Sequence, residues 1–308
     1  MSAEPQIVNS VAVLHTVQQV RQWHSEQKSQ GRRIGFVATM GALHDGHLSL
    51  VSAAAQRSDS VVVSIFVNPA QFAPHEDLDK YPRTLDQDIE KLKTTSVSPE
   101  PLRIAVFAPS VAEMYPRGIS THRDKQRGTF VEVLGLSEML EGGTRPHFFR
   151  GVATVVSKLF HIVMPDITVF GQKDVQQCCV VRAMVTDLHF PLTLVVAPTV
   201  RDKDDGLALS SRNVYLTSEQ RARAPAFYRG MCYARDLYNS GITDREALIA
   251  AVRQEAQKGG LDIEYISLTS PDDLSEIQEV KDGGAVLSGA WRMGSTRLID
   301  NILLGFGF

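Results

Sequence analysis

The sequence predicts an α/β fold, in which a Rossmann-like, doubly wound parallel sheet is followed by a second, smaller α+β domain. Short apolar runs alternate over residues 34–197 with segments whose apolar residues recur at helical spacing, a pattern typical of βαβ units. After Pro198 the pattern changes to a charged loop over 201–206, a helix-rich stretch and a closing set of β-type runs. We therefore expect a first domain over residues 1–198 and a second over 199–308.

The spacing of apolar residues predicts each element in turn. The run SVVVSIFV, residues 60–67, is typical of a buried strand, and Asn68-Pro69 ends it. In the stretch 151–164, by contrast, Val152, Val155 and Leu159 recur at helical spacing. The expected strands of the first domain are 34–39, 60–67, 104–108, 167–170 and 192–197, its expected helices are 47–57, 151–164 and 175–188, and the second domain is expected to be helical over 218–258 and extended over 263–268, 285–294 and 296–304.

The composition excludes several classes of protein. The 308 residues carry 32 basic and 35 acidic side chains, a net charge of −3, which disfavours nucleic acid as a partner. No apolar stretch is long enough to span a bilayer, and no positive charge precedes an apolar run at the start, so we expect neither a membrane partner nor a signal peptide. Cys178, Cys179 and Cys232 are too few and too irregularly spaced for a disulfide framework. We expect a cytoplasmic protein.

The loop after the first expected strand carries two histidines. It ends at His44, Asp45, Gly46 and His47, at the N-terminus of an expected helix, where free N–H groups and the helix dipole favour an anion. Because His44 and His47 are three residues apart, their rings can face one side and donate to a phosphate that gains charge. A surface turn with two incidental histidines is the alternative. A metal site would lack an obvious third ligand.

Neutral amides follow the second strand. Asn68 and Gln71 can orient a polar substrate without neutralising its charge, although an ordinary Asn-Pro turn explains Asn68 equally well. Gln177 lies on the helix that follows the strand 167–170.

Cationic and hydroxyl side chains occupy two further loops. Lys173 follows the strand 167–170 and can meet a phosphate as a flexible point charge, the alternative being a solvated turn. Ser210, Ser211 and Arg212 can hold phosphate oxygens by charge-assisted hydrogen bonds, the alternative being a helix capped by Ser211. Ligands of open α/β sheets bind beyond the carboxyl ends of the strands, which is where these loops are expected.

Eight segments in order resemble the pantoate–β-alanine ligase (pantothenate synthetase) family, within the HxGH nucleotidyltransferase superfamily. The resemblance covers nearly the whole chain. The matching segments are TMGALHDGH at 39–47, SIFVNPAQF at 64–72, YPRTLDQD at 81–88, APSVAEMYP at 108–116, GVATVVSKLF at 151–160, FGQKDVQQ at 170–177, PTVRDKDDGLALSSRN at 198–213 and RLIDNI at 297–302.

The resemblance implies a ligase that forms an amide bond in two steps. The pantoate carboxylate attacks the α-phosphate of Mg-ATP, giving pantoyl adenylate and pyrophosphate, and the β-alanine amine then displaces AMP to give pantothenate. The resemblance further implies ATP as co-substrate, Mg²⁺ as its metal and a homodimer, and we expect the second domain to close over the adenylate as a lid.

The resemblance also assigns residues to these roles. His47 is the implied proton donor, and His44 and Lys173 join it as catalytic residues that meet developing charge. Gln71 is assigned to pantoate and to the edge of the β-alanine site, and Gln177 to pantoate. Asn68 joins them as a predicted substrate residue because of its neutral amide. The residues assigned to ATP are Met40, Gly41, Ala42, Leu43, His44, Asp45, Gly46, His47, Gly171, Gln172, Lys173, Asp174, Val200, Leu209, Ser210, Ser211 and Arg212.

The chain departs from the family pattern at several positions. Gln172 replaces the usual glutamate, Ala38 the more frequent proline, and Phe148 an expected histidine, so Arg145 and His147 are left out of the predicted catalytic set. The loop 201–206 is one residue longer than usual, and 94–101 is expected to be an insertion. The protein ligands of the metal are unknown: Asp88 is a candidate, with an ordinary surface carboxylate as the alternative.

Two other functions fit the same residues. Another HxGH-type nucleotidyltransferase would need a phosphate-binding acceptor pocket, where this chain offers neutral amides. A non-catalytic nucleotide-binding dimer would bind ATP without forming AMP. A tRNA-charging enzyme is disfavoured by the length and the acidic balance.

Overall fold

The computed structural model describes residues 10–74, 76, 78–95 and 102–308, and the chain divides into two compact units. The first unit runs to Phe170 and includes Val180–Ala197. The second comprises Gly171–Cys179 and Pro198–Phe308. The short segment 171–179 thus groups with the second unit, and the domain limits 1–198 and 199–308 stay a prediction.

The first unit is built on a six-stranded sheet with the order β1-β4-β3-β2-β5-β6. The pairs β1–β4, β4–β3, β3–β2 and β2–β5 are parallel. The chain therefore winds outward from β2 through β3 to β4 and then returns to β5, which makes the boundary between β2 and β5 the topological switch point. The strands are β1 (Ser10–Leu14), β2 (Ile34–Thr39), β3 (Ser60–Ile65), β4 (Arg103–Phe107), β5 (Ile167–Gly171) and β6 (Thr193–Ala197).

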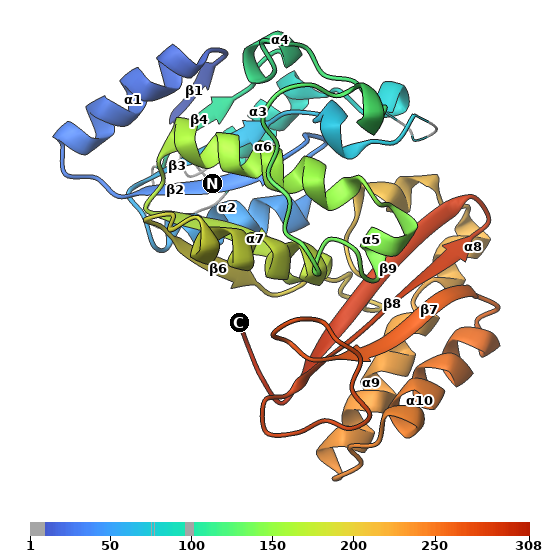
Figure 1. Cartoon of the computed structure of the whole chain (residues 1–308). Coiled ribbons are helices and arrows are strands. Elements are labelled where there is room, and N and C mark those ends of the chain that lie inside the picture. Colours follow the sequence, from blue (N-terminus) through green and yellow to red (C-terminus); the bar gives the residue numbers. More distant parts are fainter. Residues whose placement is uncertain (1–9, 75, 77, 96–101) are drawn as a thin grey trace, which may run out of the picture. The chain divides into compact units, whose positions relative to one another are not determined.

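Helices cover both faces of this sheet. Val37, Val61 and Val63 face a cluster that includes residues of α2 (Asp45–Ala55) and Leu92 of α3. Phe36 points the other way and meets Phe160 of α6 edge-to-face, with 6.1 Å between ring centroids. In Figure 1, α6 crosses in front of the sheet and α2 lies behind it. The other helices of this part are α1 (Val17–Ser29), α3 (Leu85–Thr94), α4 (Val111–Met114), α5 (Glu141–Thr144), α6 (Phe148–Val163) and α7 (Val175–Asp187), the last of which spans both units.

An ion pair ties α1 to the start of two central strands. The Lys28 ammonium lies 2.6 Å from the Asp166 carboxylate, and the same carboxylate accepts the Ile34 N–H at 2.6 Å. Burial alone would raise the pKa of Asp166, but the hydrogen bonds from Lys28 and Ile34 outweigh it and hold that pKa below its ordinary value.

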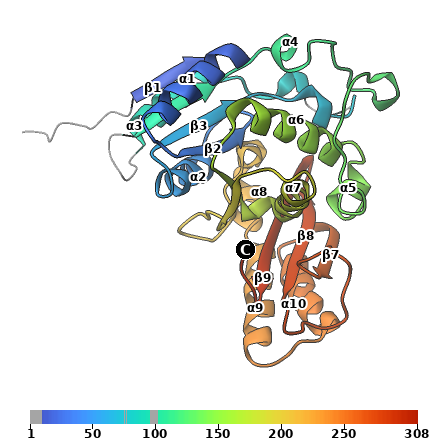
Figure 2. The same ribbon diagram turned by 60° about the vertical axis from the view of Figure 1, so that its left-hand side comes forward.

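The second unit packs two helices on one face of an antiparallel sheet. The strands have the order β7-β8-β9, and α9 and α10 run side by side along the sheet in both views (Figures 1 and 2). Phe227 of α9 stacks on Trp291 of β8 with 4.2 Å between ring centroids. The elements are α8 (Ser218–Arg223), α9 (Ala226–Asn239), α10 (Arg245–Lys258), β7 (Asp262–Thr269), β8 (Ala285–Met293) and β9 (Thr296–Leu304).

The predicted fold class is confirmed, with shifts of a few residues at most element ends. The strand 34–39 matches β2 at both ends, whereas the helix predicted over 47–57 begins two residues earlier, at Asp45. The sequence does not predict β1, α1 or α3. Cys178 and Cys179 are buried core residues, and none of the three cysteines forms a disulfide. Of the predicted insertion 94–101, Thr94 ends α3 and residues 96–101 lie outside the described part.

Candidate active site

The two histidines cap helix α2 reciprocally. His44 is the N-cap residue, and its Nδ1 accepts the Gly46 N–H at 3.1 Å. His47, three residues later, accepts the His44 N–H through its own Nδ1 at 3.4 Å. The pair thus does what Ser or Thr and Glu do in an ordinary capping box.

This capping fixes the protons of both rings. A neutral imidazole has one acceptor and one donor nitrogen, so a ring whose Nδ1 accepts carries its proton on Nε2. The ring centroids of His44 and His47 are 4.1 Å apart and the rings are tilted by 37°. Two Nε2–H donors therefore lie together at the positive end of the α2 dipole, where an anion is stabilised.

The loop before these histidines is held by a buried carboxylate. Gly41 and Ala42 both have positive φ, +87° and +52°, which is costly for alanine. Asp88 of α3 accepts the Leu43 N–H at 2.7 Å and the Ala42 N–H at 3.0 Å. The Lys91 ammonium, one turn along the same helix, donates to the Leu43 carbonyl at 2.6 Å.

The interpretation of Asp88 as a surface carboxylate is wrong. Its side chain is 0% exposed, and besides the two backbone N–H groups it accepts the Thr84 hydroxyl at 3.2 Å. A carboxylate surrounded by polar neighbours in the sequence becomes buried here because the loop supplies N–H donors for both of its oxygens. The segment YPRTLDQD indicates this residue, but only the fold shows what it binds.

A hydrogen-bonded network orients the predicted substrate amides. Asn68 caps the 3₁₀ turn η1 (Pro69–Gln71), and its amide donates to the Gln71 Oε1 at 3.0 Å and to the Gly151 carbonyl at 3.1 Å. The Tyr115 hydroxyl donates to the Asn68 Oδ1 at 2.6 Å. Burial raises the pKa of this phenol above its ordinary value, so it remains a donor.

Gln71 is thereby linked to the histidine loop. Its Nε2 lies 3.3 Å from the Met40 sulfur, and its side chain is almost fully buried. Helix α6 approaches so closely that a Cβ on Gly151 would lie 2.4 Å from the Ala70 carbonyl oxygen. Only glycine fits there. Tyr115 and Gly151, both within matched segments, are thus positioning residues that the sequence does not reveal.

Arg145, which the sequence leaves out of the catalytic set, lies behind the Gln71 backbone. It forms a two-pronged ion pair with Glu76 at 2.7 and 2.8 Å and lies 3.5 Å from the Gln71 carbonyl. Phe148, which replaces the expected histidine, lies under the guanidinium at 4.0 Å from its ring centroid. Phe148 therefore helps to hold the arginine that supports the backbone of Gln71, a predicted substrate residue.

In the second unit the predicted phosphate residues begin at the end of β5. Residues 172–174 form the 3₁₀ turn η4, with Lys173 half-buried and Asp174 exposed. Gln177 lies half-buried in the first turn of α7. The Gln172 side chain and the Gln172 and Lys173 carbonyls all bond to Asn301 of β9.

The other predicted nucleotide residues of this unit form a second loop. The Leu209 N–H donates to the Val200 carbonyl at 2.9 Å, which closes the loop over 201–208. Ser210, and not Ser211 as the alternative interpretation had it, caps the following 3₁₀ turn η5 (Ser211–Tyr215) by accepting the Arg212 N–H at 3.3 Å. Ser211 and Arg212 are half-buried on the turn itself.

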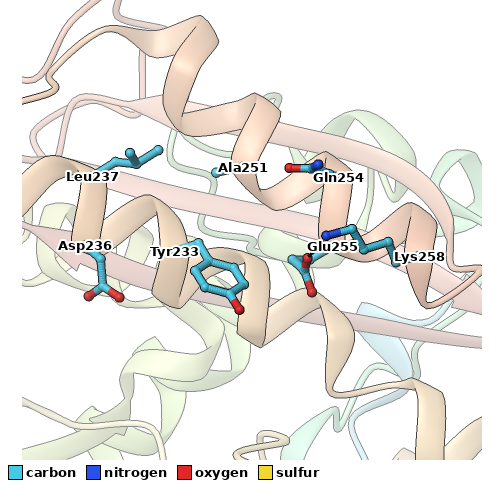
Figure 3. Close-up of a pocket in the computed structure, with 7 residues that line it drawn as sticks. All are labelled: Tyr233, Asp236, Leu237, Ala251, Gln254, Glu255 and Lys258. Atoms are coloured by element: carbon cyan, nitrogen blue, oxygen red, sulfur yellow. Dashed lines mark hydrogen bonds and ion pairs between the residues drawn. The ribbon is translucent and has the colours of Figure 1, made fainter.

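Other features of the described residues do not add to this site. No three His, Cys, Asp or Glu side chains among them are placed to hold a metal ion. None of their helices is long and apolar enough to cross a membrane. A cavity of about 430 Å³ lies between α9 and α10 and contains none of the predicted site residues (Figure 3). It is lined by Tyr233, Asp236, Leu237, Ala251, Gln254, Glu255 and Lys258.

Comparison with known proteins gives one consistent result. A model of the pantoate–β-alanine ligase family matches residues 12–303. The pantothenate synthetase of Stutzerimonas stutzeri (strain A1501) is 47% identical over 292 residues, which are 95% of this chain and 97% of that protein.

Solved structures agree. The pantothenate synthetase of Thermus thermophilus matches with a TM-score of 0.83 and 40% identity, over 94% of this chain and 98% of that one. The pantoate–β-alanine ligase of Francisella tularensis, complexed with β-γ ATP and β-alanine, matches with a TM-score of 0.72 and 33% identity, over 97% and 99% of the two chains. The chain belongs to the pantoate–β-alanine ligase family.

Proposed function

We propose that this enzyme joins pantoate to β-alanine by an amide bond, with ATP as co-substrate and pantoyl adenylate as intermediate. The observation that carries the proposal is the reciprocal histidine cap of α2, which aims two Nε2–H donors from a helix N-terminus. Donors fixed in this way suit a phosphate that gains negative charge during displacement.

In the first step a carboxylate oxygen of pantoate attacks the α-phosphorus of ATP. The new oxygen–phosphorus bond forms as the bond to the leaving pyrophosphate breaks, and negative charge grows on the pyrophosphate. His44 and His47 would donate to the phosphate oxygens, with His47 as the proton donor, and the Lys173 ammonium would add a positive charge. Since these donors are held before the reaction, little reorganisation is needed.

Pantoate is oriented by neutral groups in this proposal. A carboxylate is a weak nucleophile, and a tight arginine clamp would weaken it further. Gln71 and Gln177 leave its charge available and contribute by positioning, and Asn68 holds the Gln71 amide. The remaining nucleotide contacts come from Gly171–Asp174, Val200 and Leu209–Arg212.

In the second step the β-alanine amine attacks the acyl carbon of the adenylate. The carbon–oxygen bond to AMP breaks, the amine nitrogen releases one proton to solvent water, and pantothenate and AMP are released. An acyl adenylate hydrolyses readily, so exclusion of water matters here. The division into domains at 198/199, with the second acting as a lid, is part of this proposal.

Mg²⁺ would enter bound to ATP. The described residues offer no set of three ligands for it, and both Asp88 oxygens already accept backbone N–H groups. The phosphate oxygens and water would therefore supply most of its coordination, as is usual for this ion.

We also propose a cytoplasmic homodimer that needs neither nucleic acid nor a membrane. Three cysteines without a disulfide suit a reducing compartment, and the net charge of −3 does not favour polyanions.

Exchange of labelled pyrophosphate into ATP tests the proposal. With Mg²⁺ present, exchange should require pantoate, and added β-alanine should then release AMP and pantothenate in equal amounts. ATP binding without exchange would favour a non-catalytic nucleotide-binding protein. If pyrophosphate exchange required another carboxylic acid in place of pantoate, the adenylation step would be supported and pantoate would not be the substrate.

A further inference from the structure

The motif RLIDNI places two buried polar residues in the middle of β9, and neither has a role in the proposed chemistry. Asp300 is 2% exposed and Asn301 1% exposed. Asn301 donates through Nδ2 to the carbonyl oxygens of Gln172 at 2.9 Å and Lys173 at 3.0 Å. Its Oδ1 accepts the Gln172 side-chain amide at 3.2 Å. One side chain thus fixes the backbone of the Lys173 turn at two consecutive residues.

Asp300 reaches the other predicted nucleotide loop through one arginine. Its carboxylate forms a two-pronged ion pair with Arg201, at 2.6 and 2.8 Å, and the Arg201 guanidinium lies 3.6 Å from the centroid of the Tyr228 ring. Arg201 also bonds the Gly206 carbonyl at 3.2 Å and forms a β-bridge with Ala208. That bridge lies directly before Leu209–Arg212.

We propose that Asn301 and Asp300 are positioning residues for adenylation. Asn301 holds the turn that carries Lys173, and Asp300 holds, through Arg201, the loop that leads to Leu209–Arg212. This inference rests on the ATP-binding role proposed above for both loops. The buried residues in the middle of β9 would then position two predicted nucleotide-binding loops in addition to forming the sheet.

The physical reason is the length of the lysine side chain. A flexible four-carbon stem directs its ammonium only as well as its backbone is placed, and a displacement of about 1 Å at a reacting group can cost on the order of 10²-fold in rate. The two carbonyl bonds from Asn301 remove freedom from that backbone.

The departure at Gln172 fits the same arrangement. Asn301 uses its amide nitrogen for the two carbonyls, which leaves only an acceptor oxygen toward residue 172. Gln172 supplies the donor that this oxygen needs, whereas a glutamate would present a second acceptor.

A double-mutant cycle on pantoate-dependent pyrophosphate exchange tests the proposal. Asn301→Ala should lower kcat or raise KM for ATP by about 10- to 100-fold and leave KM for pantoate within about twofold. Because Asn301 acts through Lys173, the same substitution in a Lys173→Ala background should cause little further loss. Glu264→Gln is the matched control, since it breaks ion pairs with Arg292 and Arg297 in the same sheet, outside the site.

Hydrogen exchange gives a readout that does not depend on turnover. Amides of 171–175 should exchange faster in Asn301→Ala, and in the milder variant Gln172→Ala, than in the wild type or Glu264→Gln. The proposal would be overturned if hydrogen exchange of amides 171–175 in Asn301→Ala were as slow as in the wild type. It would also be overturned if Asn301→Ala lowered the rate of pyrophosphate exchange as much in the Lys173→Ala background as in the wild type. If wild-type protein exchanged no pyrophosphate with pantoate, the proposed function would fail, while the hydrogen-exchange arm would still decide whether Asn301 holds this turn.

Discussion

Substitution of Asp88 by asparagine tests how much the Asp88 carboxylate contributes to holding the loop that precedes His44. The change keeps the size of the side chain and replaces one acceptor oxygen by a donor. The introduced amide can accept one of the two N–H groups of Ala42 and Leu43, and its own NH₂ group then faces the other. The loop must move or leave a buried N–H without an acceptor.

The magnitude follows from these bonds. A buried donor without a partner costs about 1–3 kcal/mol, and the remaining bond weakens as its acceptor loses charge, by about 1 kcal/mol. We expect Asp88→Asn to lower the free energy of unfolding by about 2–4 kcal/mol. Ala42, at φ +52°, is then free to relax, which shifts His44 relative to the substrate and lowers the adenylation rate by about 10- to 100-fold.

Urea unfolding and pyrophosphate exchange measure the two effects. Asp86→Asn is the matched control, because Asp86 is exposed in the first turn of the same helix and the charge change is identical. An Asp88→Asn protein as stable and as active as this control would refute the reasoning, since the carboxylate would then not be what holds the loop.

Three further perturbations have defined outcomes. His47→Ala should lower adenylation by about a hundredfold or more with the protein still folded, and near-wild-type pyrophosphate exchange would remove His47 from the mechanism. Gln71→Ala should raise KM for pantoate more than KM for ATP in steady-state assays, and the reverse pattern would contradict its assignment. The pKa of Asp166 is lower in the folded protein than its ordinary value of 3.8, so the ionised carboxylate stabilises the fold at pH values above 3.8. This stabilisation is lost as the pH falls below 3.8 and through the lower pKa of the folded state. Asp166→Asn should therefore flatten the decrease in urea midpoint below about pH 4, and an unchanged slope would mean that the ion pair with Lys28 contributes nothing.

The strands and the loops that follow them could be predicted because their signals are local. A run such as residues 60–67 is apolar throughout, as a strand covered on both faces must be. Edge strand β1 is half-exposed, and α1 buries only Val20 and Gln27, so neither carries a strong apolar pattern. The helix α2 begins at Asp45, two residues before its predicted start at His47. Its N-cap residue is His44, and histidine is not among the usual N-cap residues, so the sequence gives no clear signal for this start.

The sequence suggests which residues form the candidate site, and their chemical roles stay predictions. It does not reveal most of the contacts that hold these residues in place. The residue types in the loops predict hydrogen bonds to a phosphate group and neutral amides that orient a polar substrate. The partners of Asp88, Asn68 and Asn301 come from other elements, and no spacing in the sequence reveals a hydrogen bond across 46, 47 or 129 residues. Burial of Asp88 reverses the expectation from its polar neighbours, because backbone donors of a distant loop satisfy it.

The anchoring of the Lys173 turn by Asn301 has a consequence for synthesis on the ribosome. The two residues are 128 positions apart, so at about 5–20 residues per second Asn301 is added about 6–26 s after Lys173. For that interval the growing chain carries the lysine without the side chain that orders its backbone. All six strands of the first sheet, β1 to β6, are therefore synthesised before this turn can be organised, and the role proposed for Lys173 requires that β9 has been made.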